Sequence, residues 1–260
     1  MLFVPRDGKG YCCSFFAVAA FSTTMATSVA TADDVPSSLK LHFGNETFDW
    51  LVGQDGNTEY TDNGYIFSGN DFGSGWNLNW EVMASGSEFV QSITSTFSVI
   101  NTTNSTQLYT LYFAEPVMMT STSSLVGGSV GGYVVDLNGD GAFLQSASSS
   151  DSIYSGFVDA SESGPLNEDI VGRLLTGASL EVGGFFTGNF TPESFGNVPS
   201  IPGQSGPGIE DNIGFGLTFA LSAGDAAGFS ASFAARIPGP GTAGLLGIAA
   251  LCGRRRRRRK

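Results

Sequence analysis

Alternating apolar and polar residues recur along most of the chain and predict β-strands. The clearest segment is Trp76 to Val82, in which four apolar residues alternate with three polar ones. Successive side chains of a strand point to opposite faces, so this period of two predicts a strand with one buried and one solvated face. Trp80 falls on the apolar face, and we therefore expect its side chain to lie in the core.

Two further pairs of segments show the same rhythm and are joined by short turns. Residues 89–99 and 108–113 flank the polar stretch 101–105, and residues 213–221 and 229–235 flank a glycine-containing turn. Both pairs predict β-hairpins, because a short connection commonly joins neighbouring antiparallel strands.

One segment favours a helix instead. Apolar residues recur at helical spacing within 170–175, behind Pro165, which predicts a helix over 165–178. Many short strands, turn residues throughout and a single helix predict an all-β fold of two packed antiparallel sheets. The expected architecture is an antiparallel β-sandwich, jelly-roll-like, that forms one domain over residues 33–237.

The amino-terminal residues have the pattern of an export signal. Two cations precede an apolar stretch from Ser14 to Val29. Ala30 and Ala32 then supply the small residues that signal peptidase requires just before its cleavage site. Residues 1–32 are therefore predicted to be a signal peptide that is removed during export.

The carboxyl-terminal residues form a second signal of a different kind. Pro238, Pro240 and Gly241 precede a short apolar run, and a block of seven cations follows it. A breaker motif, an apolar segment and a cationic block in this order resemble the PEP-CTERM sorting signal of bacteria, with Gly239 where the commonest form has Glu. The apolar run, residues 242–253, is shorter than the roughly 17 to 25 residues of a typical membrane-spanning helix.

This resemblance implies a path to the cell surface. In proteins with this signal, a membrane-embedded exosortase, which is a cysteine protease, recognises and cleaves the tail. The resemblance implies that residues 238–260, with a short transmembrane segment, hold the protein transiently in the inner membrane before it reaches the cell surface or the medium. Signal peptidase and an exosortase are the expected processing enzymes. An ordinary membrane anchor and a basic tail that binds nucleic acid are the alternatives for these residues.

The charge between the two signals narrows the classes of partner. Residues 33–237 contain three cations, Lys40, Arg173 and Arg236, and 23 of the 24 acidic residues, so their net charge is −20. Such a field repels nucleic acid and anionic lipid, and it favours solubility and divalent cations. All three cysteines lie within the two signals, so the ectodomain is expected to depend on a buried core rather than on disulfides.

A short acidic turn resembles the first half of a calcium-binding loop. Asp136, Asn138 and Asp140 offer side-chain oxygens at alternate positions before Gly141, which suits a tight turn. The twelfth position of such a loop needs a bidentate acid, but Ala147 stands there. The segment therefore has two interpretations, a weak calcium site and a plain hairpin turn.

Aromatic residues near the start of the ectodomain are candidates for sugar contact. Trp50, Tyr60 and Tyr65 lie in a stretch rich in Gly, Asn and Asp, and an aromatic ring can lie flat on a pyranose. His42 is the sole histidine, and no motif for an activated serine accompanies it, so we expect an ordinary strand residue there.

The expected function is that of an exported, non-enzymatic cell-surface or extracellular-matrix protein, with extracellular polysaccharide as a candidate partner. Two other classes stay open. A calcium-assisted carbohydrate-binding module would need Trp50, Tyr60 and Tyr65 exposed on one surface. A secreted hydrolase would need a cleft with two convergent acidic side chains.

Overall fold

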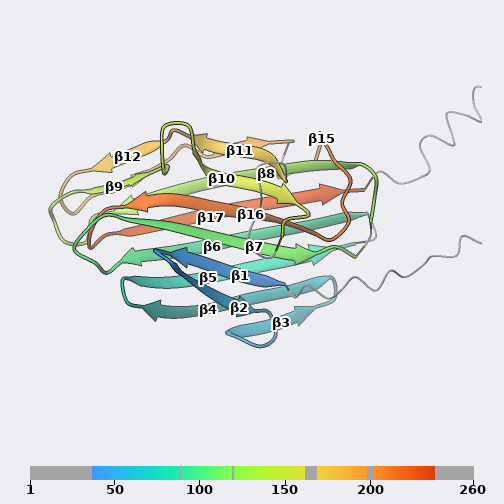
Figure 1. Ribbon diagram of the computed structural model, residues 1–260, viewed down its shortest axis with the longest axis horizontal. Helices are drawn as coiled ribbons and strands as arrows, with labels where there is room; N and C mark the ends of the chain where they lie inside the picture. Colours follow the sequence, from blue (N-terminus) through green and yellow to red (C-terminus); the bar gives the residue numbers. More distant parts are fainter. Residues whose placement is uncertain (1–36, 88, 119, 162–168, 198–201, 238–260) are drawn as a thin grey trace, which may run out of the picture. The chain divides into compact units, whose positions relative to one another are not determined.

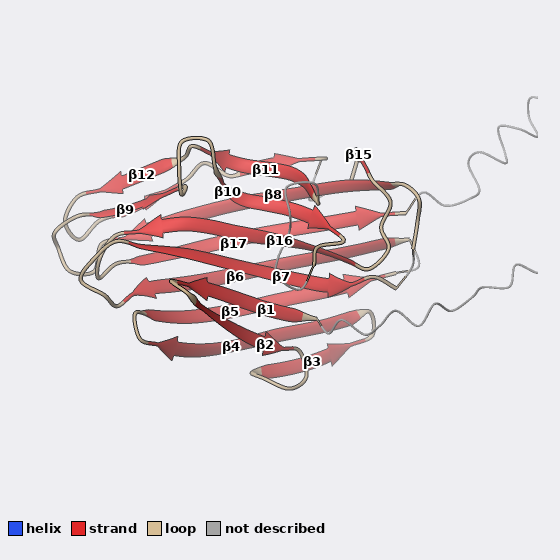
Figure 2. Cartoon of the chain, in the orientation of Figure 1, coloured by secondary structure: helices blue, strands red, loops and turns tan. Residues whose placement is uncertain are grey.

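The computed structural model describes residues 37–87, 89–118, 120–161, 169–197 and 202–237. These residues form seventeen β-strands and no helix. Figure 2 colours the strands and the loops that join them. Both predicted signals, residues 1–32 and 238–260, lie outside the described residues. Within the described ranges, no helix is long and apolar enough to cross a membrane.

The strands form two antiparallel sheets (Figure 1). Sheet A has eight strands, namely β1 (Ser38–Phe43), β2 (Glu46–Leu51), β7 (Gln107–Pro116), β9 (Ala142–Gln145), β10 (Ser152–Val158), β11 (Ile170–Thr176), β12 (Ser179–Val182) and β16 (Asn212–Leu221). Its main path runs in the order β11-β10-β16-β7-β1-β2, and β9 pairs with both β12 and β16.

Sheet B has nine strands, namely β3 (Asn57–Thr61), β4 (Gly64–Gly73), β5 (Trp76–Gly86), β6 (Val90–Asn101), β8 (Ser124–Val135), β13 (Thr187–Asn189), β14 (Glu193–Phe195), β15 (Gln204–Gly206) and β17 (Ala226–Arg236). Its main path runs β13-β8-β17-β6-β5-β4-β3, and β14 and β15 also pair with β8. The short strands β13 to β15 thus share one edge of the sheet.

The inner faces of the two sheets pack against each other around one hydrophobic core. Across the interface, the ring centroids of Phe219 in β16 and Phe229 in β17 are 4.7 Å apart, and those of Trp50 in β2 and Trp80 in β5 are 5.1 Å apart. Trp80 is 4% exposed, which confirms its predicted place in the core. The predicted all-β sandwich of two antiparallel sheets is confirmed.

Both predicted hairpins are wrong. β6 pairs with β5 and β17 in sheet B, whereas β7 pairs with β1 and β16 in sheet A. β16 and β17 likewise belong to different sheets. Each connecting turn is a corner that carries the chain from one sheet to the other.

The predicted helix over 165–178 is also wrong in its described part, where residues 170–176 form strand β11. Its apolar residues are spaced irregularly because Leu175 has a positive φ of 54°. This left-handed conformation breaks the alternation of the strand, so that the neighbours Leu174 and Leu175 are both buried. Consecutive buried residues of this kind resemble helical spacing in the sequence.

β1 begins and β17 ends at the same end of the sandwich (Figure 1). Ser38 pairs with Ala114 near the end of β7, and Gln91, next to the partner of Arg236, donates a hydrogen bond to the Pro116 carbonyl at 2.8 Å. The corners β8–β9 and β16–β17 lie at the opposite end. The acidic turn of residues 136–141 forms the first of these corners. It is therefore not a hairpin turn, because β8 lies in sheet B and β9 in sheet A.

Candidate functional site

The acidic turn, which forms the β8–β9 corner, lies beside the β16–β17 corner. The backbone N–H of Leu137, in the β8–β9 corner, donates to Asp225 Oδ1 in the β16–β17 corner at 3.2 Å. The Asn138 side-chain amide donates to the Ala223 carbonyl at 3.0 Å. These bonds bring Asp225 beside a turn that lies almost ninety positions earlier in the chain.

Asp136 organises the turn through backbone hydrogen bonds. Its Oδ1 accepts the N–H groups of Asn138 at 3.1 Å and Gly139 at 2.8 Å. Its Oδ2 accepts those of Gly141 at 3.0 Å and Phe185 at 2.7 Å. Burial opposes the charge on Asp136, but these four donors outweigh it and hold its pKa below the ordinary value. A carboxylate has about four lone-pair sites, so Asp136 would bind an ion in exchange for one of these backbone hydrogen bonds.

Asp225 lies in a less favourable setting. Its side chain is fully buried and accepts a hydrogen bond from the Ser222 hydroxyl. Burial raises the pKa of Asp225, against the hydrogen bonds from Ser222 and Leu137. The negative charges of Asp136 and Asp140 raise that pKa further. These surroundings disfavour the charged form of Asp225.

Asp136, Asp140 and Asp225 form an acidic group that could hold a metal ion, since one carboxylate oxygen from each lies within 4.8 Å of the others. Two of the three residues are buried and Asp140 is exposed. Asn138, predicted as a ligand, instead directs its side-chain oxygen to the Asp140 N–H at 3.0 Å. The sequence pattern thus found two members of the group and missed Asp225. The only local signal for Asp225 was its place in a turn after an apolar strand.

The three aromatic residues predicted to contact sugar do not share an exposed surface. Trp50 is 7% and Tyr65 is 9% exposed, and only Tyr60, at 72%, faces solvent. The indole N–H of Trp50 donates to Asp71 Oδ2 at 3.0 Å. Phe48 and Trp50 lie on either side of the exposed Asp49 in β2, and both direct their rings toward the core. The same period of two therefore also indicates, from the sequence, that Trp50 is buried.

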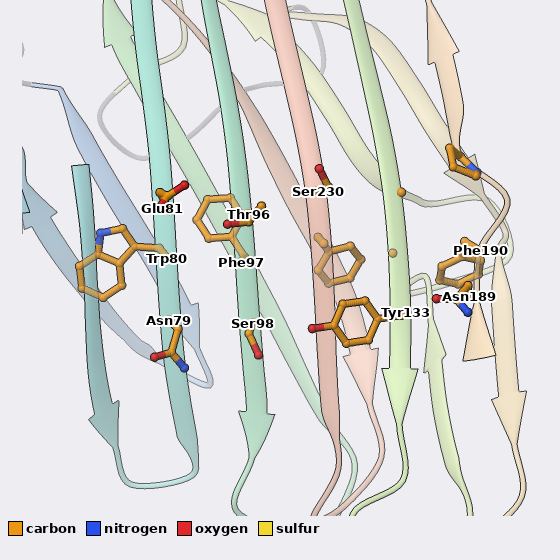
Figure 3. Close-up of a pocket in the computed structure, with 14 residues that line it drawn as sticks. Asn79, Trp80, Glu81, Thr96, Phe97, Ser98, Tyr133, Asn189, Phe190 and Ser230 are labelled. Atoms are coloured by element: carbon orange, nitrogen blue, oxygen red, sulfur yellow. The ribbon is translucent and has the colours of Figure 1, made fainter. Parts of the chain in front are cut away.

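The outer face of sheet B is hollowed between β5 and β13. We call this hollow the sheet-B groove, with a volume of about 690 Å³, and define it by Asn79, Glu81, Ser98, Tyr133, Asn189 and Ser230. Figure 3 shows Asn79 and Glu81 on one side, Tyr133 and Asn189 on the other, and short hydroxyl side chains between them. The volume is in the range of small-molecule binding sites.

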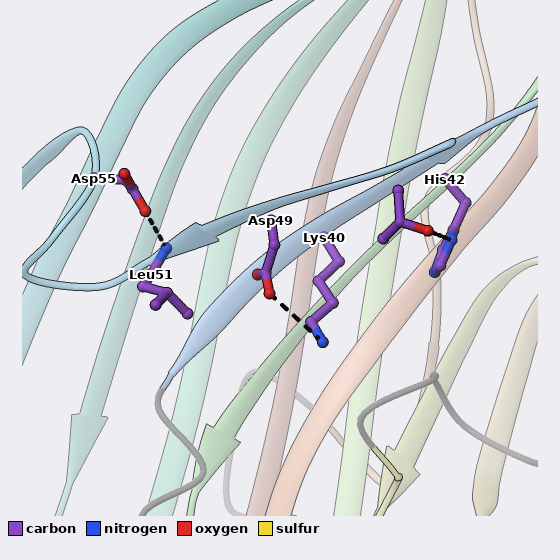
Figure 4. A network of polar contacts seen from close by, with 6 residues as sticks. Lys40, His42, Asp49, Leu51 and Asp55 are labelled. Carbon is purple, nitrogen blue, oxygen red and sulfur yellow. Dashed lines mark hydrogen bonds and ion pairs between the residues drawn. The ribbon is translucent and has the colours of Figure 1, made fainter. Parts of the chain in front are cut away.

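The outer face of sheet A carries His42 in strand β1 (Figure 4). Thr47 Oγ1 is 2.9 Å from His42 Nδ1, and the His42 ring stacks on Tyr112 with centroids 5.2 Å apart. Lys40 Nζ is 3.7 Å from Asp49 Oδ2 on the same face. Burial and the Lys40 charge lower the pKa of His42, so the ring is neutral at pH 7. With these contacts, His42 is an ordinary packed residue of strand β1.

No protein-family model matches this chain, and no curated protein matches it. The fold places it in the broad class of antiparallel β-sandwich proteins. Its function therefore has to be argued from its own residues.

Proposed function

We propose that this chain is an exported, non-enzymatic cell-surface or extracellular-matrix protein. The observation that carries the proposal is the order of three segments: residues 1–32 with the sequence pattern of an export signal, an acidic sandwich, and residues 238–260 with the sequence pattern of a PEP-CTERM tail. β17 ends at Arg236, two residues before Pro238, so the proposed sorting motif follows the last strand of the sandwich closely in the sequence. In this proposal, signal peptidase removes the first segment and an exosortase removes the last from an inner-membrane intermediate.

We also propose that the sandwich is jelly-roll-like and that a short membrane segment follows it. Repeated crossing between sheets, from β6 to β7, β7 to β8, β8 to β9 and β16 to β17, supports a jelly-roll-like arrangement. Residues 242–253, together with the motif before them, would supply the short membrane segment.

Two features argue against a hydrolase site in the sheet-B groove and at His42. Among the described residues that line the sheet-B groove, Glu81 is the only acid. A glycoside hydrolase needs a second carboxyl group that converges on the same bond. His42 stacks on Tyr112 and has no activated serine among its observed partners.

The first prediction concerns processing. If both signals are cleaved, the extracellular protein should begin near Asp33 and should lack the seven terminal cations. Intact-mass measurement of the protein recovered outside the producing cells tests both ends at once. A species that still carries Arg254 to Lys260 would refute sorting by an exosortase, whatever the sandwich binds.

A calcium-assisted carbohydrate-binding module is the second candidate. Oxygen-only ligands suit calcium, so we propose calcium as the ion for Asp136, Asp140 and Asp225. The turn also contacts the segment that leads into β13: Phe185 N–H donates to Asp136 Oδ2 at 2.7 Å, and Asp136 N–H donates to the Phe186 carbonyl at 3.1 Å. Calcium bound at this turn would therefore order one wall of the sheet-B groove.

The second prediction uses Asp140→Asn. In chelator, this change removes a charge that repels Asp136 and Asp225, and the melting temperature should rise. In calcium it removes a ligand, so most of the calcium-induced rise should disappear. A site of this kind is expected to bind in the roughly 0.1 to 1 mM range, and tenfold excess over the dissociation constant adds about 1.4 kcal/mol of stability.

The matched control is Glu59→Gln on the edge strand β3, where the side chain is exposed and distant in sequence from the turn. It also removes one acidic charge, but it should leave the calcium response of the wild type intact. Equal melting temperatures of the wild-type protein in calcium and in chelator would show that the acidic turn is structural only.

A further inference from the structure

A row of residues crosses the outer face of sheet B at right angles to the strands. Asn79 of β5 pairs with Ser98 of β6, which pairs with Gly228 of β17. Gly228 pairs with Tyr133 of β8, which pairs with Asn189 of β13. Since neighbouring strands lie about 4.8 Å apart, the row spans roughly 19 Å. The groove is therefore long enough for a chain-like ligand.

The Tyr133 ring lies over Gly228, near the middle of this row. A Cβ atom at residue 228 would lie only 2.1 Å from Tyr133 Cζ and 2.3 Å from Cε1. The ring thus rests on the backbone of β17, where any larger residue would push it away. Tyr133 is still 39% exposed, so its outer side is available to a ligand. A ring in this position is a platform on which an apolar surface can stack.

Neutral polar groups surround the platform. Asn79 and Asn189 are exposed at the two ends of the row, and their amides can both donate and accept hydrogen bonds. Thr96, Ser98 and Ser230 add hydroxyls to the floor. An amphipathic ligand with an apolar side and many hydroxyl groups matches this mixture.

The charge of the groove argues against anionic ligands. Of the described residues that line it, Glu81 alone is charged, and no lysine or arginine is among them. A phosphate, sulfate or nucleic-acid backbone would find no cation here and would meet the negative field of the domain. We therefore expect a ligand of this groove to be uncharged.

We propose that the sheet-B groove binds a neutral polysaccharide chain, which lies across the strands and stacks one sugar ring on Tyr133. This inference rests on the carbohydrate-binding candidate described above and deepens it by naming a site. It replaces Trp50 and Tyr65, which are buried. It requires neither calcium nor cleavage of the tail.

Affinity electrophoresis of the full chain tests the proposal, with hydroxyethylcellulose, dextran, arabinoxylan and galactomannan as probes in separate native gels. We expect at least one polymer to retard the wild-type protein in chelator. Tyr133→Ala should raise the dissociation constant at least tenfold, and Tyr133→Phe should keep most of the affinity because the ring persists. Ser230→Arg, at an exposed position of the floor, should block the groove and abolish retardation.

Two control variants define the site. Phe72 is 79% exposed on β4 of the same sheet but outside the groove, and Tyr60 is 72% exposed on β3. Phe72→Ala and Tyr60→Ala should bind like the wild type, and all variants should melt at similar temperatures.

The outcomes separate the site from the candidate function. Retardation that survives Tyr133→Ala and Ser230→Arg would overturn this site while leaving carbohydrate binding in place. The absence of retardation in all four gels would overturn both. Neither result bears on export and sorting, which the mass of the extracellular protein decides.

Discussion

Replacing Trp80 with alanine is expected to cost about 3 to 5 kcal/mol of unfolding free energy, the usual range for a large core aromatic. Trp80 packs between the sheets. Its ring centroid lies 5.1 Å from that of Trp50 and 5.7 Å from that of Phe67. The backbone of Gly69 lies directly against the indole, so no side chain from that position can fill the space. Denaturant unfolding of the wild-type and variant proteins measures the difference.

Phe72→Ala is the matched control for this experiment. Phe72 belongs to the strand beside Trp80 but is 79% exposed, so its loss should change stability by less than about 0.5 kcal/mol. A loss below about 1 kcal/mol for Trp80→Ala would contradict the packing of the two sheets around this ring.

The facing of strand residues could be predicted from the sequence, but the partners of the strands could not. Period two correctly placed Trp76, Leu78 and Trp80 in the core, because alternation depends only on which face is buried. The two strands of a hairpin and the two strands of a corner each turn one apolar face to the same core. Alternation is therefore identical in both cases, and the predicted pairs at β6–β7 and β16–β17 proved to be corners.

The candidate metal site likewise combines a feature that the sequence predicts with one that it does not. Asp136 and Gly139 predict a tight turn by themselves, because the hydrogen bond between them joins residues three positions apart. Asp225 joins them only because two corners meet at one end of the sandwich. The sheet-B groove depends even more on pairing, since Asn79, Tyr133 and Asn189 share a row through four strand contacts. No spacing in the sequence encodes that row.

Glu115 gives the second large effect and a dependence on pH. Its carboxylate accepts a hydrogen bond from the Tyr65 hydroxyl. Burial raises the pKa of Glu115, while hydrogen bonds from Tyr65 and Ser37 oppose that rise. Because the folded pKa lies above the unfolded value, the contribution of Glu115 to stability is complete below about pH 4.3 and is lost as pH rises through the folded pKa.

Tyr65→Phe should therefore cost more above the folded pKa of Glu115 than at pH 4. Above that pKa the change removes a donor from a partly buried carboxylate, which is worth about 1.5 to 3 kcal/mol, whereas at pH 4 it removes a bond to a largely neutral acid, worth about 0.5 to 1.5 kcal/mol. Glu115→Gln keeps an acceptor for the hydroxyl without the charge, so relative to the wild type it should gain stability as pH rises through the folded pKa of Glu115. Denaturant unfolding at a series of pH values from 4 upward measures both variants. If Tyr65→Phe costs the same across the whole series, the Tyr65 hydroxyl does not stabilise a buried charge, and its bond to Glu115 is an ordinary neutral one.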